Sequence, residues 1–110
     1  MAGSNLYSGT LDLLVLRSLG WGPIHGYAIG GWIRRSSKGV LQIEEGALYP
    51  ALHRLENRGW LEAEWGLTDK GRQAKFYRLT AEGRKQLDAE TERWSSHAAA
   101  VRAVLVAERS

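Results

Sequence analysis

The sequence contains no cysteine and only two prolines, Pro23 and Pro50. Without cysteine the chain can form neither a disulfide nor a thiolate metal site, so we expect hydrophobic packing to supply its stability in a reducing compartment. The longest aliphatic run covers residues 13–16, far short of the roughly 20 residues that cross a bilayer. Residues 1–8 lack the basic and apolar stretches of a signal peptide. We therefore expect a cytoplasmic protein without a membrane segment.

The composition is that of a single folded domain. The chain has 110 residues, of which 44% are hydrophobic and 25% charged, a balance too apolar for a disordered tail. Fifteen Lys and Arg against twelve Asp and Glu leave a net charge of +3, which permits nucleic acid binding without establishing it. A domain of this size buries only roughly 60 to 70% of its unfolded surface, so a partner subunit is plausible.

Hydrophobic periodicity predicts three helices in the first half of the chain. The first spans residues 8–19 and ends at Gly20; its apolar face comprises Leu11, Leu14, Val15 and Leu19. The second is expected to open near Pro23 and to run to about residue 36. The third spans residues 45–58, and its apolar face comprises Leu48, Leu52 and Leu55. Gly59 is placed to end this helix, and Pro50 is expected in or near its first turn.

The second half predicts a hairpin followed by one long helix. Residues 60–65 and 75–80 alternate with the period of a strand, and residues 66–72 supply the loop between them. Thr80 is a good N-cap for a helix that can run to about residue 108, a length of about 39 Å for 26 helical residues. Steps of four and three residues along this helix are typical of a coiled-coil seam. Its apolar or small positions are Leu87, Trp94, Ala98, Val101 and Leu105, and Thr91 fills the gap between the first two.

Two features point toward nucleic acid, and each has an ordinary alternative. The third helix turns Tyr49, His53 and Arg54 away from its apolar face, as a helix that enters a major groove would. The same pattern also describes a solvated helix face. The hairpin gathers four cations at and near its glycine-bearing tip, and these are Lys70, Arg72, Lys75 and Arg78. Such charges can bind phosphates, but they also protect an exposed sheet edge. Together the two features favour nucleic acid.

Nothing in the sequence predicts catalysis, a cofactor or a metal site. The three histidines, His25, His53 and His97, are far apart and match no metal-binding spacing. No serine or threonine lies in a nucleophile motif, and no GxGxxG sequence follows a strand. We therefore expect a protein that is not an enzyme.

Six blocks of sequence, spread over nearly the whole chain, carry a family resemblance. They are GTLDLLVL at residues 9–16, GPIHGY at 22–27, EEGALYPALHRLE at 44–56, GWLEAEW at 59–65, KFYRLT at 75–80 and GR at 83–84. In this order they resemble the PadR-like family of winged-helix transcription regulators. The resemblance implies a mainly α fold, with a winged helix-turn-helix and a two-stranded wing over residues 1–80. A long dimerisation helix over residues 81–110 would complete the same structural unit.

The resemblance also implies a mode of DNA binding. The third helix, as residues 46–58, would enter the major groove of double-stranded operator DNA, with Tyr49, Pro50, His53 and Arg54 nearest the bases. The wing contacts would come from Lys70, Arg72 and Lys75, and residues 25–27, including His25 and Tyr27, could meet phosphate. Ala47 stands where the family commonly has threonine, so one polar contact is missing there.

A homodimer and an effector follow from the same resemblance. The family places its C-terminal helix against the first helix of the other subunit, which would bury Leu11 and Leu14 against the seam that contains Leu87. Some members bind small aromatic or phenolic compounds at this interface. Trp94, with His97 and side chains of the first helix, could line such a pocket, although core packing is the simpler role for Trp94.

The sequence therefore favours a homodimeric, sequence-specific DNA-binding regulator that acts as a repressor. One rival is a winged-helix module that binds proteins and has lost DNA binding. Another is an RNA-binding winged helix, but the sequence shows no exposed aromatic platform of the usual kind for RNA bases.

Overall fold

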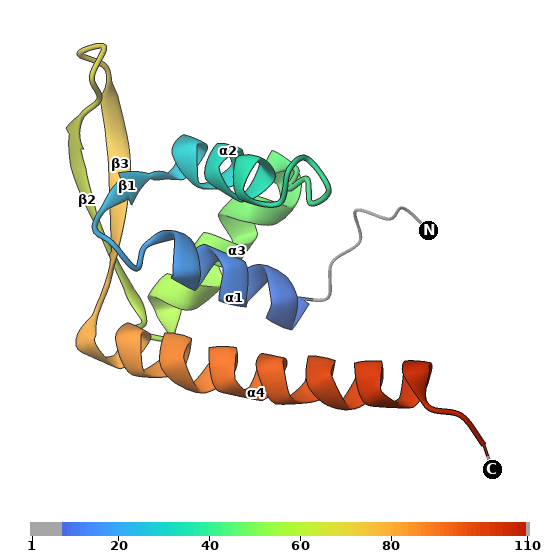
Figure 1. Ribbon diagram of the computed structural model, residues 1–110. Helices are drawn as coiled ribbons and strands as arrows, with labels where there is room; N and C mark the ends of the chain where they lie inside the picture. Colours follow the sequence, from blue (N-terminus) through green and yellow to red (C-terminus); the bar gives the residue numbers. More distant parts are fainter. Residues whose placement is uncertain (1–7, 110) are drawn as a thin grey trace.

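A computed structural model of the protein describes residues 8–109. It has four helices and a three-stranded antiparallel sheet (Figure 1). The elements in chain order are α1 (Ser8–Ser18), β1 (Ile24–His25), α2 (Gly26–Ser36), α3 (Glu45–Asn57), β2 (Leu61–Leu67), β3 (Gln73–Leu79) and α4 (Ala81–Val106). The predicted winged helix-turn-helix with a long C-terminal helix is confirmed. The expectation that residues 1–8 are not a signal peptide falls almost wholly on residues 1–7, which lie outside the described residues.

The sheet contains a strand that periodicity did not predict. Its order is β1-β3-β2, and the two-residue β1 pairs Ile24 with Tyr77 and His25 with Phe76. Pro23 therefore precedes this short strand instead of opening α2, which begins at Gly26. Two residues are too few to show a period, so β1 could not be predicted from the sequence. It pairs with the edge of β3 that β2 leaves open. This pairing ties the start of α2 to the wing.

The wing is longer than its predicted strands. Gly66 pairs with Ala74 and Leu67 with Gln73, so both belong to the ladder and the loop shrinks to residues 68–72. The hydroxyl of Thr68 accepts a hydrogen bond from the Arg72 backbone N–H at 3.2 Å, which closes this loop. Gly71 lies at the tip of the wing with a φ of +76°, a backbone conformation that favours glycine.

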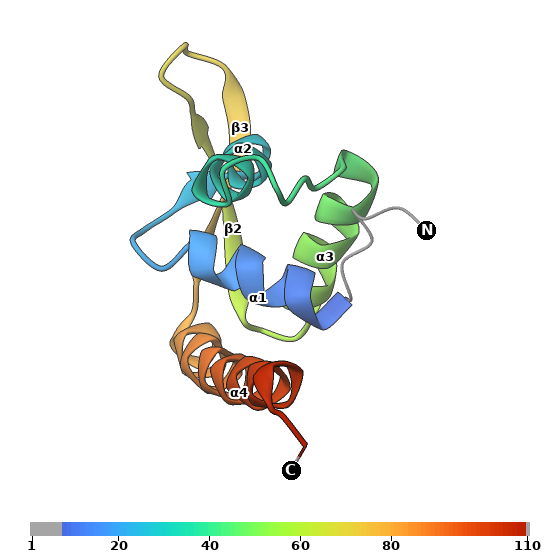
Figure 2. The same ribbon diagram turned by 45° about the vertical axis from the view of Figure 1, so that its right-hand side comes forward.

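The core lies between α1, α2, α3 and the start of α4 (Figure 2). Its buried residues are Leu11, Val15, Leu16, Leu19, Ile29, Ile33, Leu48, Ala51, Leu52, Leu55, Leu61, Tyr77 and Leu87. Gly59, with a φ of +80°, follows α3 as predicted. Pro50 is the sixth residue of α3 and lies just after its first turn, as predicted. Pro50 and Gly46 are exposed, so water can reach the Gly46 carbonyl, which has no helical donor.

The long helix α4 begins in close contact with the wing. The Thr80 hydroxyl accepts a hydrogen bond from the Gly83 N–H at 3.0 Å, as an N-cap should, and donates to the Gly59 carbonyl at 2.6 Å. Gly83 lies directly against the Trp60 backbone. A Cβ added to Gly83 would stand 2.0 Å from the Trp60 carbonyl oxygen, so no side chain fits there. Beyond this start, the C-terminal half of α4 extends past the other helices (Figure 1).

Replacing Gly83 with alanine should therefore destabilise the fold. We expect Gly83→Ala to lower the free energy of unfolding by roughly 2 to 3 kcal/mol, because the obstacle is backbone that cannot rotate away. Urea unfolding followed by circular dichroism measures the change. The matched control is Gly46→Ala in α3, where no atom lies within 4 Å of the added Cβ and the helix should gain up to about 1 kcal/mol. Equal effects of the two changes would contradict the close approach.

Candidate nucleic-acid interface

The outward face of α3 carries most of the residues expected to read bases. Its inner face buries Leu48, Ala51, Leu52 and Leu55 in the core. The residues on the opposite side are exposed, and they include Ala47, Tyr49, Pro50 and His53. The i, i+4, i+7 spacing of the leucines thus decides which side chains face outward.

Arg54 has a different surrounding from the one expected. Its guanidinium Nη2 lies 2.7 Å from Oδ1 of Asp12, a residue of α1 that is only 8% exposed. Arg58 lies against the same carboxylate, with 3.6 Å between its Nη1 and Oδ2 of Asp12. The sequence predicts Arg54 among the residues nearest the bases; in the structure its guanidinium is paired with Asp12, and its side chain remains 39% exposed.

The start of α2 lies beside both α3 and the wing. Gly26 is buried under the ring of Tyr49, and a Cβ at Gly26 would stand 3.0 Å from Tyr49 Cε1. His25 stacks nearly parallel to Tyr27, with ring centroids 6.5 Å apart, and meets Phe76 of β3 edge-on at 5.5 Å. Tyr27 itself is 75% exposed. Residues 25–27 therefore present ordered aromatic rings between α3 and the wing.

Two hollows join these elements into one surface. One, of about 400 Å³, is lined by Tyr49 of α3, Tyr27 of α2, and Trp65, Lys75 and Tyr77 of the wing. The other, of about 510 Å³, lies nearer the tip and is lined by His25, Tyr27, Leu67, Lys70, Arg72 and Phe76. Burial raises the pKa of the Tyr77 phenol, and the nearby Glu56 and Tyr49 raise it further. We call this surface the wing groove.

The wing groove corrects one expectation about aromatic residues. Tyr27 and Trp65 are 75% and 66% exposed, and both line it. The sequence showed no exposed aromatic platform, because neither residue lies in a recognisable RNA-binding motif. Strand pairing and the short β1 bring them together in space.

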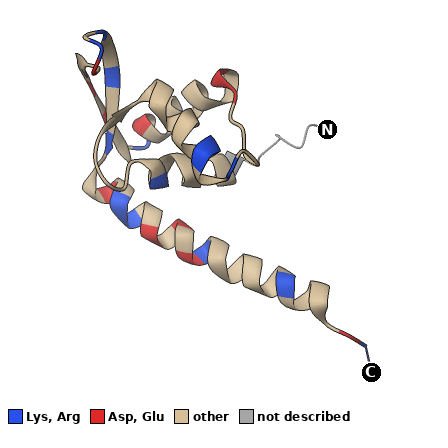
Figure 3. Ribbon diagram, turned by 45° about the horizontal axis from the view of Figure 1, so that its top comes forward, with Lys and Arg blue, Asp and Glu red and all other residues tan. Residues whose placement is uncertain are grey.

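The cations of the wing differ in how free they are. Arg78 donates hydrogen bonds to Glu62 and Glu64, both at 3.1 Å, and these bonds raise its pKa above the usual range. The charge of Arg78 is thus balanced by two glutamates on the sheet, and Arg78 does not line the wing groove with the other three predicted wing cations. Lys70, Arg72 and Lys75 line the wing groove instead, together with one acid, Asp69. Figure 3 shows both basic and acidic positions near the end of the hairpin.

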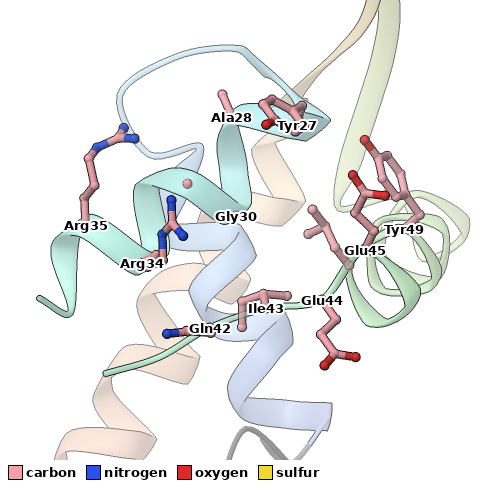
Figure 4. A pocket seen from close by; sticks show the side chains of 12 residues that line it. Tyr27, Ala28, Gly30, Arg34, Arg35, Gln42, Ile43, Glu44, Glu45 and Tyr49 are labelled. Carbon is pink, nitrogen blue, oxygen red and sulfur yellow. The ribbon is translucent and has the colours of Figure 1, made fainter. Parts of the chain in front are cut away.

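A third hollow, of about 600 Å³, lies between α2 and the start of α3 (Figure 4). Arg34 and Arg35 line it from α2, while Glu44 and Glu45 line it from the α3 side. Two cations and two anions leave no formal charge, so this hollow has no preference for a polyanion such as DNA. The wing groove, with its lysines and arginine, is the better match to phosphate.

The predicted dimer residues fall into two groups. Leu11 and Leu87 are buried inside the chain's own core, because the start of α4 packs on α1 of the same chain; Arg84 also donates to the Gly20 carbonyl at 3.0 Å. Their assignment to a subunit interface is therefore corrected. Leu14 and Ala98 are half-buried, while Trp94, Val101 and Leu105 are 48%, 43% and 77% exposed. His97 is exposed on the same helix.

Two further surveys concern the part of the chain that the structure describes, residues 8–109. Within it, no three His, Asp or Glu side chains gather in a way that could hold a metal ion. None of the helices over this range is both long and apolar enough to cross a membrane.

A winged helix with an exposed recognition helix and a cationic hairpin on one surface defines a class of transcription regulator. The model of the transcriptional regulator PadR-like family matches residues 15–89, so the chain belongs to this family. Regulators of this family act on DNA and are not enzymes.

Individual relatives agree with this membership. The chain is 32% identical over 95 residues to an uncharacterised protein of Lysinibacillus sphaericus. The matched region covers 86% of this chain and 87% of that protein. Among solved structures it is similar to a transcriptional regulator from Clostridium thermocellum, with 31% identity, a TM-score of 0.77 and coverage of 86% and 91% of the two chains. A PadR family regulator from Eggerthella lenta gives 33% identity, a TM-score of 0.76 and coverage of 91% and 85%.

Proposed function

We propose that this protein is a homodimeric repressor that binds double-stranded operator DNA through α3 and the wing. The observation that carries the proposal is the wing groove, because it unites Tyr27, Tyr49 and Lys75 from three separate elements. All three were expected DNA contacts, and all three line one hollow on one side of the molecule. Binding near a promoter would repress by excluding the transcription machinery.

In this proposal α3 reads bases and the wing holds the backbone. Tyr49, Pro50 and His53 would approach base edges in the major groove, and the Ala47 methyl group could contact a thymine methyl group. Lys70, Arg72 and Lys75 would meet phosphates, as would His25 and Tyr27 at the start of α2. Phosphate contacts set affinity and register, whereas the exposed face of α3 sets sequence preference.

The assignment of the wing makes a prediction about salt. Lys70→Ala should weaken binding to all duplexes and reduce the slope of log K against log salt concentration by about one, since each phosphate contact contributes about 0.9. His53→Ala should instead cost roughly 1 to 3 kcal/mol on the operator alone. Fluorescence anisotropy with the upstream region of the gene, random duplex and random RNA measures both effects.

The control for Lys70 is Lys85→Ala, which removes an exposed lysine from α4, away from the wing groove. It should leave the salt slope unchanged. If Lys70→Ala also leaves the slope unchanged, the wing does not hold DNA. If the unaltered protein shows no salt-dependent binding to any duplex, the alternative of a winged-helix protein-interaction module is favoured. Preference for random RNA over duplex would favour the RNA-binding rival, for which the exposed Tyr27 and Trp65 would offer stacking surfaces.

The dimer is proposed from the exposed half of α4. Trp94, Val101 and Leu105 lie on one side of this half and face solvent in a single chain. Pairing that buries about 1,000 Å² of apolar surface would contribute about 25 kcal/mol before the costs of association. Two α3 helices held in this way would meet half-sites about 34 to 36 Å apart, if the dimer docks as helix-turn-helix dimers usually do.

A charge on this seam should separate the subunits. We expect Val101→Glu to convert the protein to a monomer at micromolar concentration in light scattering, because a carboxylate cannot be buried there without a partner. Ala103→Glu is the matched control: residue 103 is exposed and, at 3.6 residues per turn, lies on the opposite side of α4. A monomeric unaltered protein, or equal effects of both changes, would contradict the proposed interface.

We also propose that a small aromatic or phenolic effector relieves repression at this interface. Trp94 is 48% exposed on the seam, with His97 nearby in the sequence, and an indole can stack on a flat ligand. Trp94 lines none of the three hollows described above, and in this proposal side chains of a second chain complete its pocket.

Trp94→Leu should abolish the response to such a compound. The measurement is release of operator DNA during titration with a phenolic acid, compared between the unaltered protein and the variant. Trp21→Leu is the control, because Trp21 is also exposed but lies in the link between α1 and β1. An effector response that survives Trp94→Leu would assign Trp94 to packing alone.

A further inference from the structure

Asp12 is the one carboxylate of α1, and it is bound to α3 by two arginines. It is 8% exposed, whereas the side chains of Arg54 and Arg58 are 39% and 50% exposed. One oxygen accepts from Arg54 at 2.7 Å, and the other lies 3.6 Å from Arg58. Both arginines belong to the last turns of the recognition helix or its C-cap. The carboxylate therefore lies under the helix, and the guanidinium groups reach back toward it.

This arrangement controls where the two positive charges point. A buried carboxylate that lost its partners would pay a large desolvation cost, so the pairing with Arg54 is strongly favoured in the folded chain. Arg58 has a second internal partner, since its guanidinium lies 5.2 Å from the centroid of the Trp60 ring. Both groups are partly exposed and could reach a nearby phosphate if they were released.

We propose that Asp12 is a specificity-determining residue that withholds Arg54 from the DNA backbone. This inference rests on the proposed binding of duplex DNA by α3. Every cation that reaches a phosphate adds affinity for any sequence, whereas base contacts add affinity for the operator alone. His53, the neighbour of Arg54 in the chain, is exposed and has no such internal partner among the ion pairs of residues 8–109. Holding Arg54 inward therefore keeps non-specific binding low.

Asp12→Asn tests the inference with little change in shape. Losing the negative charge should free Arg54, raise affinity for random duplex and steepen the salt slope by about 0.9 for each phosphate gained. The ratio of operator affinity to random-duplex affinity should fall. Arg54→Gln alone should leave the slope unchanged, in contrast to Lys70→Ala. The double variant Asp12→Asn/Arg54→Gln should give a shallower slope than Asp12→Asn alone, because Arg54 is removed and Arg58 keeps its contact with Trp60.

The alternatives give different results in the same anisotropy titrations. If Asp12 only supports the fold, Asp12→Asn weakens operator and random duplex equally, and the proposal is overturned. If Arg54 already contacts phosphate, Arg54→Gln flattens the slope by about one, which also overturns it. Should Asp12→Asn not fold by circular dichroism, Arg54→Gln is tested in its folded form, where a flattened slope overturns the proposal and an unchanged slope supports it. Absence of salt-dependent binding by the unaltered protein would instead overturn the proposed function.

Discussion

The burial of one face of α3 against α1 is the constraint on which the rest of this structure depends. Leu48, Leu52 and Leu55 are all at most 3% exposed, and they leave α3 no freedom to rotate about its axis. Once these leucines are inside, Tyr49 and His53 must be outside. The exposed face of α3, which is proposed to read DNA, is thus a consequence of core packing.

The same packing brings charges of α3 within reach of α1 and so decides which cations are free. Arg54 and Arg58 are bound by Asp12, and Arg78 is bound by two glutamates of β2. The modest net charge of +3 is therefore unevenly divided. Arg54, Arg58 and Arg78 are held in ion pairs, while Lys70, Arg72 and Lys75 line the wing groove. A protein with little total charge can in this way present a local site for phosphate.

Hydrophobic periodicity, together with the residues that begin and end helices, was enough to predict the four helices and the wing. The leucine spacing of α3, the glycine at residue 59 and the Thr80 cap each act over a few residues, so the local sequence carries them. Partners distant in the chain could not be predicted. Asp12 and Arg54 are 42 residues apart, and β1 is visible only through its pairing with β3. The exposed aromatic residues of the wing groove come together for the same reason.

The helix α4 shows a further limit of sequence patterns. Its apolar positions repeat evenly from Leu87 to Leu105, yet Leu87 is 2% exposed and Leu105 is 77% exposed in the same chain. A heptad-like pattern identifies a face to be buried but does not say which chain will bury it. The first turns of α4 complete the winged helix, because Gly83 and Leu87 pack against its own wing and α1. The later turns keep Trp94, Val101 and Leu105 exposed in a lone chain, and this exposed stripe is the feature on which the proposed dimer rests.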